Sequence, residues 1–138
     1  MQHKRLEHIP NVTFRHVAQL RKMNIHTTQQ LLEVCSTVEE RYRLAEKLEI
    51  SELRVFDWVC AIDLFRISGL HSTYVTLLLE AGINSAEKIA TQNAPELAAQ
   101  LRELNQTNRI VRRLPNKRQI EGWIVAARQL PPLFEAPR

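Results

Sequence analysis

Five basic side chains between positions 109 and 118 are the residues of this sequence best suited to bind an anion. They are Arg109, Arg112, Arg113, Lys117 and Arg118, and no acidic residue lies between Asn105 and Ile120. A planar guanidinium group donates two parallel hydrogen bonds to a phosphate or a carboxylate. If 109–113 is helical, the three arginines in it share one face. The segment therefore predicts an anion-binding patch; the alternative is an insertion whose arginines pair with Glu and Asp of neighbouring helices.

A second group of candidate residues lies in two turns. Ile67-Ser-Gly-Leu-His71, followed by Tyr74-Val75 and Ala81-Gly-Ile83, resembles the helix-hairpin-helix motif. The resemblance implies that amides at the following helix start contact phosphates without reading base sequence. The motif has two glycines: Gly69 fills the first position, and His71 replaces the second.

An equivalent turn at 9–13 has Asn11 and Thr13 at the two glycine positions. Asn tolerates left-handed backbone geometry and Thr is a suitable helix cap. We therefore expect the turn shape to persist there, with a weaker approach to phosphate. Arg15, just inside the next helix, completes the candidate anion-binding residues.

Catalytic and metal chemistry find no support in the residue spacing. The five histidines show no zinc-ligand spacing with Cys35 and Cys60, and no glycine-rich phosphate loop, nucleophile elbow or paired carboxylates occur. We expect no catalytic residue, metal, cofactor or small-molecule substrate, and a protein that is not an enzyme. Both cysteines are expected to be buried thiols in a reducing cytoplasm. No apolar segment is long enough to span a membrane, and the N-terminus is unlike a secretory signal.

The composition predicts an all-α fold. The chain has 138 residues, of which 44% are hydrophobic and 25% charged, and only three are glycine. Good helix formers dominate, and Ser, Thr or Asn caps precede apolar stripes of helical period. We predict eight helices, at about 13–23, 27–35, 38–48, 52–65, 72–81, 85–92, 95–104 and 117–130.

An internal repeat organises these helices. Ile9–Leu20 aligns with Ile67–Leu78 at an offset of 58 residues, with matching apolar positions. We expect an N-terminal arm at 1–8 and a single domain at 9–130, made of repeat 9–65 and repeat 67–130. A loose or lightly docked tail is expected at 131–138.

Several side chains have an expected place in this fold. Trp58 and Trp123 are predicted to be core residues. Residues 38–57 hold six acids and four bases and predict a solvated mixed face. The remaining aromatic residues are expected to be buried or half-buried, with one exposed: Phe14, Tyr42, Phe56, Phe65 and Tyr74.

Nearly the whole chain, roughly 9–130, is similar to a bacterial family frequent in cyanobacteria, catalogued as domain of unknown function 4332. The resemblance rests on four segments: Ile67-Ser-Gly-Leu, Leu79-Glu-Ala-Gly-Ile-Asn, Ile110-Val-Arg-Arg-Leu-Pro and Gly122-Trp-Ile. It implies a tandem helix-hairpin-helix fold and implies no chemistry.

Two functions remain open. The net charge is +4. A second basic group lies near the N-terminus, where Glu7 is the only acidic residue among Lys4, Arg5, Arg15, Arg21 and Lys22. The first hypothesis is a non-catalytic module that binds nucleic acid through the hairpin turns and the arginine-rich segment. The second is a protein-interaction adaptor that docks an acidic partner through the same arginines, with Pro-Pro-Leu-Phe of the tail adding an apolar contact.

Overall fold

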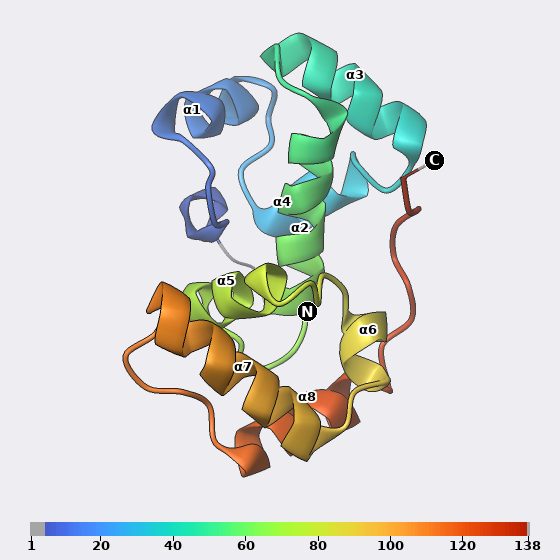
Figure 1. Ribbon diagram of the computed structural model, residues 1–138. Helices are drawn as coiled ribbons and strands as arrows, with labels where there is room; N and C mark the ends of the chain where they lie inside the picture. The colour runs from blue at the N-terminus through green and yellow to red at the C-terminus, as the bar shows by residue number, and fades with distance from the viewer. Residues whose placement is uncertain (1–4, 138) are drawn as a thin grey trace. The chain divides into compact units, whose positions relative to one another are not determined.

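Residues 5–137 are described by the computed structural model, and they form an all-α structure (Figure 1). A short 3₁₀ helix, η1 (Leu6–His8), precedes the α-helices. These are α1 (Phe14–Lys22), α2 (Thr28–Glu33), α3 (Val38–Leu48), α4 (Glu52–Phe65), α5 (Ser72–Glu80), α6 (Ala86–Ala90), α7 (Ala94–Asn108) and α8 (Lys117–Ala127). Residues 5–137 contain no β-strand, and Arg5 and Thr27 form an isolated bridge. The all-α prediction is confirmed.

Side-chain caps set most helix starts. Thr37 and Glu40 form a reciprocal capping box at α3, and Asn116 and Gln119 form another at α8. Each cap oxygen accepts a hydrogen bond from a backbone amide that has no partner within the helix. The helix ends are harder to predict: α7 continues to Asn108 rather than 104, and Arg109 ends it with a φ of 47°.

The chain divides into two compact units. The first contains the chain up to Ile62 together with the C-terminal segment from Leu133, and the second runs from Asp63 to Pro132. The boundary falls within α4, whose last residues belong to the second unit. In the second unit α6 and α7 both pack against α8, and α7 also contacts α5 (Figure 1).

Each unit buries its own apolar side chains, and each contains one tryptophan. Trp58 is 1% exposed in the first unit and Trp123 is 4% exposed in the second, so both are core residues as predicted. Leu20 and Leu31 are fully buried in the first unit, as are Leu78 and Ile89, 58 positions later, in the second.

The backbone repeats its conformation at the same offset of 58 residues. Asn24 and Gly82 end α1 and α5 with φ of 63° and 81°. The amide that follows each of them donates back into the helix, from Ile25 to Leu20 and from Ile83 to Leu78, at 3.0 and 2.9 Å. The bounds of α1 and α5 also differ by this offset. The two segments thus share one local backbone pattern.

Candidate anion-binding site

Residues 109–116 form a loop between α7 and α8, which we name the arginine loop, and Lys117 and Arg118 are the first two residues of α8. Residues 109–113 are not helical, so the condition under which the three arginines would share a helical face is not met, because Arg109 leaves α7 in a left-handed conformation. The Asn105 side chain shapes the loop instead. Its Nδ2 donates to the Val111 oxygen and its Oδ1 accepts from the Val111 amide, both at 3.0 Å.

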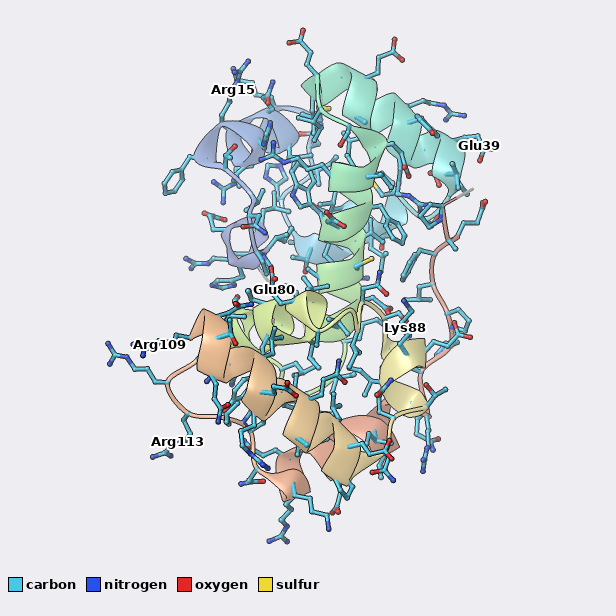
Figure 2. The ribbon with its side chains drawn as sticks, in the orientation of Figure 1. Arg15, Glu39, Glu80, Lys88, Arg109 and Arg113 are labelled. Atoms are coloured by element: carbon cyan, nitrogen blue, oxygen red, sulfur yellow. The ribbon has the colours of Figure 1, made fainter. Side chains whose placement is uncertain are left out.

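The basic side chains of this loop and of the first turn of α8 face solvent. Among residues 5–137, no carboxylate forms an ion pair with Arg109, Arg112, Arg113 or Arg118, all of which are exposed. Lys117 lies 3.9 Å from Glu121, with both side chains more than half exposed, and such a pair contributes little. Figure 2 shows Arg109 and Arg113 pointing away from the helices, whereas Lys88 lies on α6. These cations keep their capacity to bind an anion.

A hydrogen bond joins this loop to the start of α5. The Tyr74 hydroxyl donates to the Arg113 backbone oxygen at 3.2 Å, and the Tyr74 ring packs on buried Trp123 with centroids 5.6 Å apart. Tyr74 lies in the first turn of α5, directly after the turn at 67–71. This hydrogen bond links Arg113 to the helix that follows the turn containing Gly69 and His71.

The turn before α5 is open. Gly69 is exposed with a φ of +88°, and a Cβ built there would meet no atom within 4 Å. His71 occupies the cap position, is exposed, and makes no side-chain hydrogen bond to the helix start. His71 thus does not cap the start of α5 with its side chain, and a helix start attracts anions through the positive end of its dipole.

The corresponding turn in the first unit is closed by its own cap. Asn11 has a φ of 65°, as expected for a left-handed turn residue. The Thr13 hydroxyl accepts from the His16 amide at 3.2 Å and lies 2.9 Å from His16 Nδ1. Arg15 is exposed on α1, in the same unit (Figure 2).

The N-terminal basic group is partly neutralised. Arg21 donates to both carboxylate oxygens of Glu7 at 2.8 Å, and this hydrogen bond lowers the pKa of Glu7. Lys4 lies outside the described residues.

Sequence analysis missed several placements. Phe14 and Tyr42 are 89% and 60% exposed, so two aromatic side chains face solvent rather than one. Arg41 and Glu52, assigned to a solvated face, are 0% and 9% exposed and pair at 3.1 Å. Their burial depends on contacts with segments distant in sequence, which no local pattern reports.

The histidines, cysteines and carboxylates form no metal cluster within residues 5–137. Cys35 and Cys60 are both buried, as predicted, and are not joined in a disulfide. Burial raises the pKa of Cys35 to about 12. In the same part of the chain, every helix is too short or too polar to cross a membrane.

No curated protein and no solved structure matches the chain. A family model, described as domain of unknown function (DUF4332), matches residues 10–130. The chain belongs to this family.

Proposed function

We propose that the second unit is a non-catalytic module that binds the phosphate groups of nucleic acid. The observation that carries the proposal is the contact between Tyr74 and Arg113, which holds an unpaired cationic loop against the start of α5. A phosphate near this helix start would meet backbone amides and guanidinium groups together. We also propose that the two similar halves of the chain form a tandem helix-hairpin-helix domain and that the protein acts in the cytoplasm.

The contacts of the aromatic residues favour recognition of the backbone rather than of bases. Tyr74 is held by Trp123 on its ring and by Arg113 on its hydroxyl. It is therefore committed to the fold and is not free to stack on a base. Binding through phosphates alone depends weakly on sequence and strongly on salt.

The test is a fluorescence-polarisation titration at low salt with labelled duplex and single-stranded oligonucleotides. We expect Arg113→Gln and Arg112→Gln to weaken binding to both ligands, and the double variant to weaken it further. Lys88→Gln removes the same charge from an exposed position on α6 in the same unit and is the matched control. Absence of binding to either oligonucleotide would reject the proposal.

The adaptor hypothesis has one specific observation in its favour. Phe14 is 89% exposed at the first position of α1, beside a turn whose helix start is already capped by Thr13. An apolar ring at such a place suits a protein surface better than a phosphate. A pull-down after nuclease treatment, with Phe14→Ser as the comparison, tests this alternative.

One of the two apolar side chains in the Pro-Pro-Leu-Phe tail is engaged within the first unit, whereas Leu133 is 40% exposed. Phe134 is half-buried, and its ring packs on Phe56 with centroids 5.8 Å apart. Of the two expected states of the tail, loose or lightly docked, residues 133–137 adopt the docked one, within the first unit.

A further inference from the structure

The C-terminal segment after α8 is bound as an extended peptide. Residues 133–137 have no helix or strand, yet they belong to the first unit, although the residue before them belongs to the second. In Figure 1 the red end of the chain lies beside the start of α3. A segment without internal hydrogen bonds stays in place only through contacts with its surroundings.

Glu135 is held through both of its backbone groups. Its amide donates to the Ser36 oxygen at 2.7 Å, and its carbonyl oxygen accepts from Arg41 Nη2 at 2.6 Å. The preceding side chain, Phe134, packs edge-on against Phe56. Backbone hydrogen bonds with one inserted side chain are the usual contacts of a bound extended peptide.

The receiving residues are held in place by the first unit itself. Arg41 is 0% exposed, donates to Glu52 Oε1 and to the Cys35 oxygen at 3.1 Å, and lies 5.0 Å from the centre of the Phe56 ring. These three contacts are made with residues outside the tail and orient the guanidinium. Its Nη2 then needs an acceptor, because an unpaired donor on a buried charge is costly.

We infer that Ser36, Arg41 and Phe56 form a peptide-binding site, which we name the tail site. Its occupant is the C-terminal segment of the same chain, held as a built-in ligand. The site accepts an extended peptide with an aromatic side chain, followed by a residue recognised through its backbone amide and carbonyl. This inference is independent of the arginine loop and of nucleic-acid binding.

The tail site can be tested in the full-length chain. Phe134→Ala weakens the built-in ligand and leaves the site residues intact. A labelled synthetic peptide with the sequence of residues 131–138 is then titrated against wild type and this variant. A tethered ligand competes at a high effective concentration, so we expect the peptide to bind the variant about tenfold or more tightly than wild type.

Two controls separate site-specific binding from non-specific association. A peptide carrying Ala in place of Phe134 is expected to lose affinity for the variant by about tenfold or more, because it lacks the ring that anchors it. A peptide carrying Ala in place of Leu133, which is 40% exposed, is expected to bind like the parent. Arg112→Gln/Arg113→Gln is expected to leave peptide binding unchanged.

A chain ending at Pro132 gives a second measurement. It should bind the peptide at least as tightly as Phe134→Ala, with amide-exchange protection restored around Ser36 and Arg41. If this truncated chain does not fold, the comparison of peptide affinity between wild type and Phe134→Ala decides alone. Equal affinity for wild type and Phe134→Ala, or no binding to the folded variant, would overturn the tail site.

Discussion

Asn11 and Gly69, 58 positions apart, both adopt a left-handed backbone conformation, with φ of 65° and 88°. Each lies two residues before a helix cap, Thr13 in the first case and His71 in the second. Left-handed geometry is accessible to Gly without strain and to Asn at a small cost. The same turn is therefore built from two different residues, and only the one at His71 is left without a side-chain cap.

Replacing Gly69 by Ala should destabilise the second unit by about 1 kcal/mol. A Cβ at this position meets no atom within 4 Å, so the cost comes from the backbone angle alone. Asn11→Ala should destabilise the first unit by a smaller amount, and Asn11→Gly should change it by a few tenths of a kcal/mol. Amide exchange measured by mass spectrometry reports each unit separately. A neutral Gly69→Ala would contradict the left-handed turn.

The local backbone could be predicted from the sequence because its causes are local. Thr37 and Glu40 stand three positions apart before an apolar stripe, and the helix begins between them at Val38. The shape of the arginine loop could not be predicted, because the left-handed Arg109 and the Asn105–Val111 hydrogen bonds leave no periodic pattern in the sequence.

Contacts across long sequence separations could not be predicted. Arg41 is separated from Glu135 by 94 residues, and nothing in a charged helical segment indicates that one arginine of it is buried. In the candidate site, the cations and the turn were predicted from residue type. The contact between Arg113 and α5 depends on Tyr74, whose hydroxyl partner lies 39 residues away.

The salt dependence of oligonucleotide binding should identify the loop arginines as phosphate contacts. Each cation that neutralises a phosphate releases a counterion, so log K falls linearly with log salt. Removing Arg113 should reduce the steepness of this line by about one. Lys88→Gln should leave the slope unchanged, since Lys88 lies on α6 rather than on the loop. Equal slopes for wild type and Arg113→Gln would assign the affinity to other groups.

Asp63 should be the most sensitive polar residue of the second unit. It is 3% exposed, its Oδ2 accepts from the Ala86 amide at 2.8 Å, and its Oδ1 accepts from Arg66 at 2.7 Å. Asp63→Asn leaves the guanidinium without its countercharge and should cost about 3 kcal/mol of unfolding free energy. Urea unfolding and amide exchange in α6 measure the loss.

The matched control for Asp63 is Glu121, which also pairs with a basic side chain in the second unit. Its partner Lys117 is 3.9 Å away and both side chains are exposed. Glu121→Gln should therefore change the unfolding free energy by less than about 0.5 kcal/mol. Similar losses in the two variants would mean that burial does not set the strength of the Asp63 pair.

The first unit should lose stability when the pH falls below the ordinary histidine pKa. Burial, with Arg54 and Arg15 nearby, lowers the pKa of His16 from 6.5. The unfolded chain therefore takes up this proton at a higher pH than the folded chain does. The stabilisation is complete above pH 6.5 and is lost as the pH falls through the pKa of the folded state.

This histidine effect can be separated from that of the carboxylates in the same unit. The pKa values of Glu7 and Glu40 are lowered from 4.5, so their contribution is lost only in more acidic solution. His16→Gln should flatten the fall in unfolding free energy just below pH 6.5, measured by urea titrations at a series of pH values. His71→Gln, an exposed histidine of the second unit, should leave it unchanged. If the His16 variant keeps the wild-type slope, burial of this ring is not what makes the first unit sensitive to mild acid.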